Sequence, residues 1–268
     1  MFDTSHIPIA EYIDGDAFEN LQLEGVVYVK TDEVKDLRES ISTSRVLITH
    51  NSDLGIDDDL ASLVFEHNPN LIAWFGQNVE SRHDKLVPIP IGLERTRWFP
   101  HLKKRECLRE LAERSLEPPS KLCLANFSVS TNPGERRACL KAASSFATLQ
   151  APDTVRQDTA DTYARYLATI LEHKFVLCPN GNGVDTHRLW ETLYLGRLPI
   201  VTRSLVTEAF AGLPMVILNS WTDLSSTRLL SYWDDFRRGL VPYTLDHLFM
   251  SYWQDRIRSA ARGKSSFG

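Results

Sequence analysis

Cysteine, long apolar runs and basic residues are all scarce in this sequence. The four cysteines, at positions 107, 123, 139 and 178, are scattered without the spacing of metal ligands. Cys123 and Cys178 lie in apolar runs typical of strands, where a thiol behaves as a small hydrophobe. We therefore expect reduced cysteines in the core of a cytosolic protein.

Long apolar runs are missing as well. No stretch reaches the roughly 18 uninterrupted apolar residues that a membrane-spanning helix needs. The amino end has neither the basic start nor the apolar stretch of a signal peptide. We therefore expect a cytoplasmic protein without a membrane span.

Basic residues are outnumbered by acidic ones. The chain has 30 Lys and Arg against 35 Asp and Glu, a formal net charge of -5. A protein that binds the nucleic-acid backbone normally has a basic excess, so we expect no nucleic-acid partner and a small-molecule ligand instead. The 268 residues, 43% of them hydrophobic, suffice for the core of one large or two small domains.

Expected strands and helices alternate along the chain, which is typical of open parallel sheets and predicts an α/β fold. The expected strands are residues 25–30, 45–49, 71–75, 86–91, 121–127, 175–178, 198–202 and 214–221. The expected helices are residues 32–42, 58–66, 101–114, 163–172, 223–233 and 242–258, with two more after residues 137 and 186.

Two adjacent prolines at positions 118 and 119 follow the charged helix of residues 101–114 and cannot continue it. They predict a stiff linker around residues 115–120. We therefore expect two Rossmann-like domains, an amino-terminal one over residues 1–117 and a carboxyl-terminal one over residues 118–268.

The loop after the strand of residues 175–178 is the most informative part of the chain. It contains Pro179, Gly181 and Gly183, and Thr186 is suited to cap the following helix. With the next strand these residues form a βαβ unit, whose loop lies at the carboxyl edge of the sheet. Glycine lets the backbone approach a ligand there, and the helix amino terminus offers N–H groups to an anion. This pattern predicts a site for a nucleoside diphosphate.

Arg188 and Glu191 follow on that helix and share a face, because they are three residues apart. A guanidinium can bind phosphate through two hydrogen bonds, and a carboxylate can accept both hydroxyls of a ribose. The pair thus fits both ends of a nucleoside diphosphate. The alternative is a surface ion pair beside an ordinary glycine loop.

Residues 174–201 resemble the donor-binding domain of the exostosin-like glycosyltransferases. The resemblance lies in the patterns Phe-x-Leu-x-Pro-x-Gly, Asp-x-x-Arg-x-Trp-Glu and Gly-x-x-Pro-Ile-Val, and it is thin elsewhere in the chain. It implies a GT-B fold, in which two Rossmann-like domains face each other across a cleft and the carboxyl-terminal one holds a nucleotide-sugar. It also implies that Arg188 lies near the diphosphate and Glu191 at the ribose.

In such a domain the loop after the strand of residues 121–127 also faces the donor. Arg136 at the following helix start is suited to meet a phosphate, and Asn126 supplies an amide. The alternative is an arginine solvated on the flank of the helix, which we favour more for Arg137. The expected donor-binding residues are Asn126, Arg136, Asn180, Gly181, Asn182, Gly183, Thr186, Arg188 and Glu191.

The catalytic candidates are His50 and Asp53, which follow an expected strand and would project from the carboxyl edge of the first domain. An inverting transferase needs a base to take the proton of the acceptor hydroxyl, and either side chain suffices. A retaining enzyme needs no such base. Alternatively, His50 bonds to the backbone and residues 51–53 cap a turn.

Three further polar residues are expected at strand ends on the acceptor side of the cleft. They are Gln77, Asn78 and Glu94. The acidic run at residues 57–59 precedes an apolar-periodic helix, where acids favour the amino-terminal dipole, and we do not expect it to bind metal. We expect no metal and no cofactor.

Together these features predict a metal-independent glycosyltransferase of polysaccharide or glycan biosynthesis. It would move a sugar from a nucleoside-diphosphate sugar to a hydroxyl of a glycan or lipid-linked acceptor, and that acceptor would bring it into peripheral contact with a membrane. One alternative is a nucleotide-sugar-binding module without catalysis. Another is a hydrolase that uses His50 and Asp53 around a metal.

Overall fold

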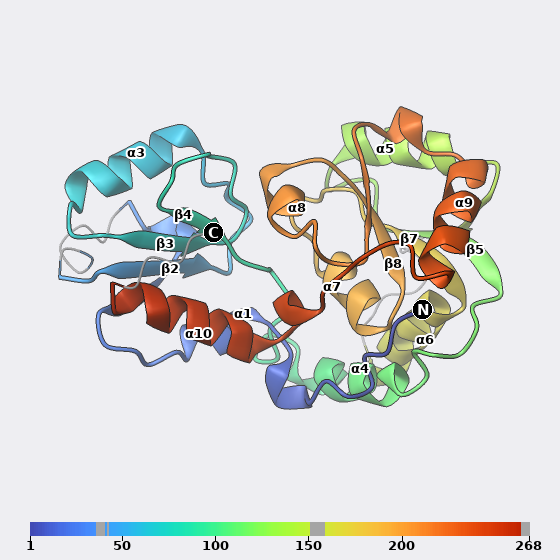
Figure 1. Cartoon of the computed structure of the whole chain (residues 1–268), viewed down its shortest axis with the longest axis horizontal. Coiled ribbons are helices and arrows are strands. Elements are labelled where there is room, and N and C mark those ends of the chain that lie inside the picture. The colour runs from blue at the N-terminus through green and yellow to red at the C-terminus, as the bar shows by residue number, and fades with distance from the viewer. Residues whose placement is uncertain (36–40, 42, 151–158, 264–268) are drawn as a thin grey trace.

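Two parallel sheets form the framework of the protein (Figure 1). The computed structural model describes residues 1–35, 41, 43–150 and 159–263. The first sheet has the strand order β1-β2-β3-β4 and the second has the order β6-β5-β7-β8-β9. The expected α/β class is confirmed at this level: the fold is mixed α/β with sheets of four and five strands.

The two middle strands of the first sheet are buried throughout, as parallel strands usually are, whereas its first strand is only partly buried. Its strands are β1 (Val26–Lys30), β2 (Val46–His50), β3 (Ala73–Gly76) and β4 (Leu86–Pro88). Helix α3 (Asp58–His67) covers one face, and the Asp57 side chain accepts a hydrogen bond from the Leu60 N–H at its start. The acidic run thus lies at a helix amino terminus, as predicted.

The other face of the first sheet is covered by helices from both ends of the chain. These are α1 (Gly15–Glu19) and the carboxyl-terminal helix α10 (Met250–Ala261), which packs beside β2 (Figure 1). The expected helix of residues 242–258 is wrong in its first half. Only the short 3-10 turn Asp246–Leu248 forms there, because Thr244 donates its N–H to Gly212 O at 2.8 Å and Phe249 is extended.

The second sheet contains β5 (Lys121–Asn126), β6 (Ala147–Gln150), β7 (His173–Leu177), β8 (Leu198–Thr202) and β9 (Val216–Leu218). The expected strands here are confirmed in place, whereas β6 was not predicted, because it is short and its end is exposed. The surrounding helices are α4 (Lys104–Ala112), α5 (Pro133–Ala143), α6 (Ala160–Leu171), α7 (His187–Tyr194), α8 (Leu205–Ala209) and α9 (Ser226–Arg237).

Helix α5 begins earlier than expected, with Asn132 as its cap and Pro133 in its first turn. Of the helix predicted over residues 32–42, residues 36–40 and 42 lie outside the described residues, and residues 32 and 33 belong to the 3-10 turn Thr31–Glu33. Cys123, Cys139 and Cys178 are buried free thiols, as predicted for core cysteines, and Cys107 is partly buried.

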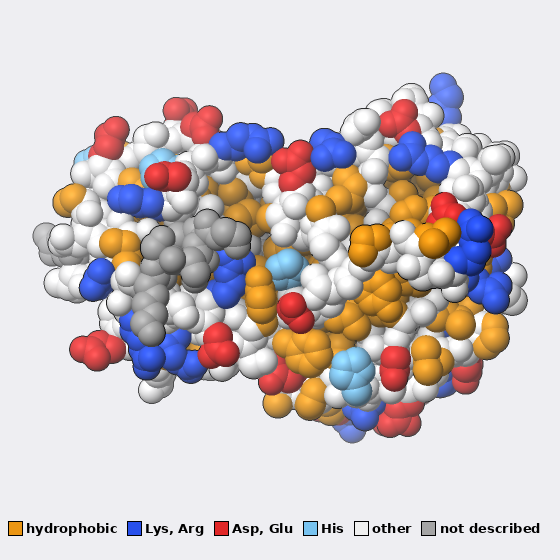
Figure 2. Space-filling model, viewed as in Figure 1, with side chains coloured by type: hydrophobic (Ala, Val, Ile, Leu, Met, Phe, Trp, Pro, Cys, Tyr) orange, Lys and Arg blue, Asp and Glu red, His pale blue; other side chains and the backbone are white. Residues whose placement is uncertain are grey.

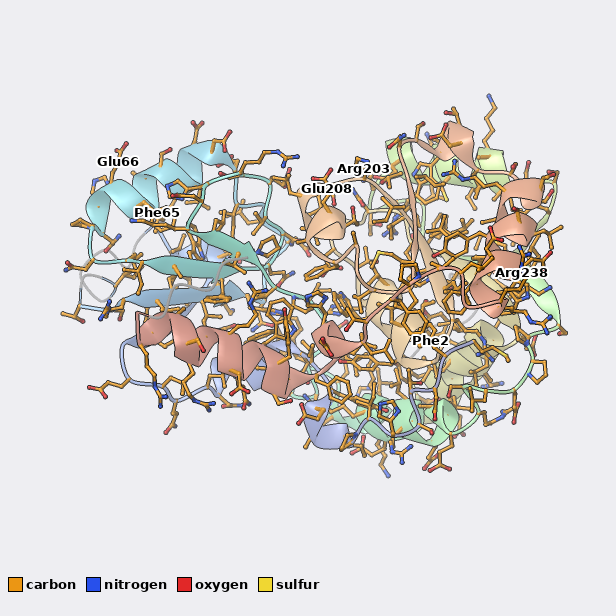
Figure 3. The ribbon with its side chains drawn as sticks, viewed as in Figure 1. Phe2, Phe65, Glu66, Arg203, Glu208 and Arg238 are labelled. Carbon is orange, nitrogen blue, oxygen red and sulfur yellow. The ribbon has the colours of Figure 1, made fainter. Side chains whose placement is uncertain are left out.

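The expected linker of residues 115–120 is held by hydrogen bonds from Arg197. The buried Arg197 guanidinium donates to Ser115 O at 2.5 Å, Glu117 O at 2.9 Å and Leu171 O at 2.9 Å. Helix α4 precedes the linker but packs on α6 and α7 beside the second sheet, and Phe2 packs on Phe236 there (Figure 3). The division of the chain at residue 117 stays a prediction.

Segments that pass between the two sheets meet at Tyr194, at the end of α7. The Ile13 N–H donates to Tyr194 Oη at 3.0 Å, and Tyr194 Oη donates to Leu248 O at 2.9 Å. The Leu93 N–H in turn donates to Ile13 O at 2.7 Å. At a separate place Glu208 forms ion pairs with Arg82 and with Arg203. Glu208 and Arg203 are labelled in Figure 3. No helix in the described part of the chain has the length and apolar character to cross a membrane.

Candidate functional site

Two adjoining pockets lie at the carboxyl ends of the strands. The larger, of about 490 Å³, lies at the start of α7 and is here called the α7 pocket. The smaller, of about 270 Å³, lies at the end of β2 and is called the β2 pocket. Both are bordered by the same five residues, which we call the seam: Asp53, Ile91, Glu94, Trp98 and His187. The expected loops of both sheets therefore face one hollow.

The glycine loop after β7 is pressed between Arg136 and Asn78. A Cβ on Gly181 would lie 2.9 Å from Arg136 Nη2, and a Cβ on Gly183 would lie 2.5 Å from Asn78 Nδ2. The loop is also tied to α5, because Arg136 Nε donates to Asn180 O at 2.8 Å. Its glycines are thus needed for close approach.

Asp185 holds the loop and the first-sheet side together, and our sequence reasoning did not select it. Its carboxylate accepts hydrogen bonds from Ile91 N–H at 2.8 Å, Thr186 N–H at 2.8 Å and Trp190 Nε1 at 2.9 Å. Burial raises the pKa of Asp185 to about 6, against the lowering effect of these donors. The sequence feature that points to Asp185 is its place as the first residue of the Asp-x-x-Arg-x-Trp-Glu pattern.

Thr186 is at the cap position of α7, as predicted, but its side chain makes no capping hydrogen bond. Asn182 and Thr186 both border the α7 pocket. Asn126 does not: it lies at the end of β5 and donates to Gln150 Oε1 at 2.9 Å. The structure thus brings Gly181, Asn182, Gly183 and Thr186 to the pocket, whereas Asn126 and Asn180 are not among the residues that border it.

Arg188 borders the α7 pocket with one nitrogen of its guanidinium unsatisfied. Its Nε is buried and has no hydrogen-bond partner among the residues that the structure describes. Its guanidinium lies 5.7 Å from the Phe127 ring centre, and that of Arg136 lies 5.6 Å from the same ring. Burial, together with the charge of Arg188, lowers the pKa of Arg136 to about 10. Two guanidinium groups in such proximity favour an anion between or beside them.

Lys104 adds a third cation that the sequence did not reveal, because it lies in α4, before the linker. Its Nζ is 5.0 Å from the Tyr163 ring centre and 3.8 Å from Glu94 Oε2, and the residue borders the α7 pocket. On the face drawn in Figure 2, basic and acidic side chains occur over both parts of the molecule. Charges of both signs are thus spread over this face, whereas Lys104, Arg136 and Arg188 come together at the α7 pocket.

Glu191 is buried and bonded to tyrosines. Its Oε1 accepts from Tyr163 Oη at 2.8 Å and its Oε2 from Tyr166 Oη at 2.9 Å. Burial, with this carboxylate nearby, raises the pKa of both tyrosines well above the ordinary value. The alternative of a surface ion pair between Arg188 and Glu191 is therefore wrong, and Glu191 reaches the pocket as part of a hydrogen-bonded group.

Both ring nitrogens of His50 are engaged in hydrogen bonds. Its Nε2 lies 3.0 Å from Pro90 O, and its Nδ1 accepts from the Asn51 N–H at 2.8 Å. Burial lowers the pKa of His50 to about 4. The ring thus binds the backbone, as the alternative interpretation states. Asp53 is exposed in the seam and accepts from Asn182 Nδ2 at 3.0 Å.

The three residues expected on the acceptor side have different surroundings. Gln77 borders the β2 pocket, and its Oε1 accepts from the Asn51 N–H at 2.9 Å. Asn78 has a positive φ of 54° and links the two sides, because its Oδ1 accepts from the Asp185 N–H at 3.0 Å. Glu94 lies in the seam, with its Oε1 3.7 Å from His187 Nε2.

Metal ligands do not cluster in the described residues. No group of three or more His, Cys, Asp or Glu side chains there is placed to hold a metal ion. Comparison of the sequence with protein-family models gives no matching family, and comparison with curated proteins gives no similar sequence. The evidence that bears on function therefore lies in the residues of the two pockets.

Proposed function

We propose that the protein is a glycosyltransferase that moves a sugar from a nucleoside-diphosphate sugar to a hydroxyl of a glycan or lipid-linked acceptor. The observation that carries this proposal is the unpaired Arg188 at the start of α7. A buried guanidinium nitrogen without a partner in the described chain is costly unless a ligand binds it. A diphosphate supplies such a partner.

The surroundings of Arg188 support a diphosphate over a single carboxylate. Arg136 and Lys104 border the same pocket, and the first N–H groups of α7 point to its loop side. Negative charge grows on the diphosphate as the bond to the sugar breaks. Cations fixed beforehand stabilise that charge without a metal ion.

Glu191 and Tyr166 suit the nucleoside end. Each carboxylate oxygen accepts one tyrosine hydroxyl and keeps a second lone pair for a ribose hydroxyl. The α7 pocket, of about 490 Å³, is within the usual size range of ligand sites. The resemblance to the exostosin-like glycosyltransferases agrees with this placement.

We further propose the GT-B arrangement, with the first sheet on the acceptor side and the second on the donor side. The two pockets meet at the seam, so a donor in one would present its sugar to an acceptor in the other. The setting would be the cytoplasmic biosynthesis of a polysaccharide or glycan, with peripheral membrane contact where the acceptor is lipid-linked.

Thermal unfolding with a panel of UDP-, GDP-, dTDP- and CMP-sugars tests the proposal. A ligand at about 100 times its Kd stabilises by about 2.7 kcal/mol, which raises Tm by roughly 5–10 °C in a protein of this size. Arg188→Ala should abolish the shift. The matched control is Arg137→Ala, on the exposed side of α5 and outside the pocket, which should keep it.

Two other outcomes are informative. No shift with any nucleotide-sugar would refute the donor site. A shift without any release of nucleoside diphosphate, with water or glycosides as acceptors, would favour the binding module without catalysis.

A further inference from the structure

His187 is the first residue of α7 and borders both pockets. Its side chain is 31% exposed, so a ligand can reach the ring. Its Nδ1 lies 2.8 Å from Gly92 O. A carbonyl only accepts hydrogen bonds, so Nδ1 carries the proton and, in the neutral ring, Nε2 carries the lone pair.

The carbonyl that orients His187 is fixed by the backbone. Gly92 has a positive φ of 65°, and a Cβ at this position would lie 2.2 Å from Ile13 O. The next residue, Leu93, donates its N–H to that same oxygen at 2.7 Å. Gly92 therefore has little freedom, and the imidazole that it binds keeps one orientation.

Nε2 of His187 is open toward the seam. Its nearest acidic atom, Glu94 Oε1, is 3.7 Å away, which is too far for a hydrogen bond. Of the other two base candidates, His50 uses both ring nitrogens, and Asp53 accepts from Asn182 through Oδ2 but keeps Oδ1. His187 differs from Asp53 in that its ring has a fixed orientation. His187 and Arg188 both border the α7 pocket, so the proposed base and the proposed phosphate-binding cation face the same cavity.

The β2 pocket beside His187 has the character of a sugar site. Trp98 is half exposed at the seam and offers an aromatic face, and Asp32 binds Ser52 through Oδ1 and keeps Oδ2 for a hydroxyl group. The amides of Asn51 and Gln77 also border the pocket, but they are hydrogen-bonded within the protein. Arg95 also borders the pocket, but it is paired with Asp16 and Glu19. The described residues that border this pocket include no lysine and no unpaired arginine, in contrast to the α7 pocket with Arg188, so a phosphate would lack a cation and the pocket favours an uncharged ligand.

We propose that the β2 pocket binds an uncharged sugar and that His187 takes the proton of its reacting hydroxyl. The inference rests on the proposed function. The hydroxyl proton moves to His187 Nε2, and the oxygen forms a bond to the anomeric carbon of the donor. The bond from that carbon to the diphosphate breaks, and the nucleoside diphosphate leaves with the electron pair. Configuration is inverted, and Glu94 faces the imidazolium that results.

His187→Ala tests the assignment with the donor that gives the largest thermal shift and with methyl glucoside, galactoside and mannoside as acceptors. We expect kcat to fall by about 10²–10⁴-fold, with an unchanged thermal shift by the donor, and partial recovery in added imidazole. The matched control is His67→Ala: His67 also binds a carbonyl through Nδ1, at 2.8 Å from Leu63 O, but lies on α3 away from both pockets. This control should keep the wild-type rate.

The outcomes separate the two proposals. If the wild type binds no nucleotide-sugar and releases no diphosphate, the proposed function fails. If the wild type transfers sugar and His187→Ala does so at the same rate, or loses rate together with donor binding or without recovery in imidazole, His187 is not the base and the proposed function stands.

The class of acceptor has its own test. Trp98→Ala should raise the KM for the methyl glycoside at least about tenfold, and glucose 6-phosphate should be a poorer acceptor than methyl glucoside. Equal use of the phosphorylated and the neutral sugar would overturn the assignment of an uncharged ligand.

Discussion

The turns after β2 and after β7 look alike in sequence but differ in their hydrogen bonding. Both follow a buried strand and both are rich in polar residues. After β2, His50 and Gln77 bind the Asn51 N–H, and Asn51 itself has a positive φ of 61°. After β7, the buried Nε of Arg188 finds no partner in the described chain. The comparison shows that polar side chains at a strand end can be satisfied within the protein, so they do not by themselves mark a ligand site.

Among the variants that compare the two turns, the largest effect is expected from Arg188→Ala. In the proposed function Arg188 stabilises the leaving group, so its removal should lower the rate of nucleoside diphosphate release by about 100-fold or more. The fold should not suffer, because Arg188 makes no hydrogen bond through Nε within the described chain. Steady-state kinetics and the Tm of the free protein check both halves of this prediction. A tenfold or greater loss in His50→Gln as well would break the comparison between the turns.

Asp185→Asn should have the next largest effect, this time on stability. The amide would place a donor against the N–H groups of Ile91, Thr186 or Trp190, at a cost of about 2 kcal/mol in the free energy of unfolding at pH 7.5. The measurement is urea unfolding of both proteins.

The difference in the free energy of unfolding between wild type and Asp185→Asn should also depend on pH. The pKa of Asp185 is raised to about 6, so its contribution favours the fold at low pH and is lost as the pH rises through about 6. The difference between wild type and Asp185→Asn should therefore grow by about 1 kcal/mol from pH 7.5 to pH 5. A constant difference would show that Asp185 titrates normally.

His50→Gln should act in the opposite direction. The pKa of His50 is lowered to about 4, so unfolded chains bind a proton that the folded protein excludes once the pH falls below the ordinary value. From pH 7.5 to pH 5 the wild type should lose about 2 kcal/mol of stability that the variant does not lose. Equal losses would mean that the His50 ring takes up a proton as readily in the folded protein as in the unfolded chain.

The smallest effect is expected from Gly183→Ala. The new Cβ would press on the Asn78 amide and displace the loop, at a cost of about 1 kcal/mol and with weaker donor binding. Gly134→Ala is the matched control, since a Cβ there meets nothing within 4 Å. If both variants bind the donor as the wild type does, the loop is not held against Asn78.

Local patterns predicted much of this molecule. Apolar runs such as those of β2, β7 and β8 gave correct strands because buried parallel strands need little else. Arg188 was found because its motif is local. Short or exposed elements such as β6 and α1 have too few residues for a clear period.

The remaining parts of the site depend on contacts between distant segments. Lys104 reaches the α7 pocket from α4, and Asp185 accepts a hydrogen bond from the N–H of Ile91, which is 94 residues away. The orientation of His187 depends on the Gly92 carbonyl, 95 residues away. No periodicity or spacing rule carries such information, so these residues emerge only when the sheets are placed together.

The junction at Tyr194 has a mechanical consequence. Its hydroxyl joins Ile13 and Leu248, and Leu93 is bonded to Ile13, so three segments between the sheets share one hydrogen-bonded group. The two sides are also tied where Ile91 bonds to Asp185 and where Asn182 bonds to Asp53. Because the ties lie at several places, rotation of one sheet against the other would have to break several hydrogen bonds at once.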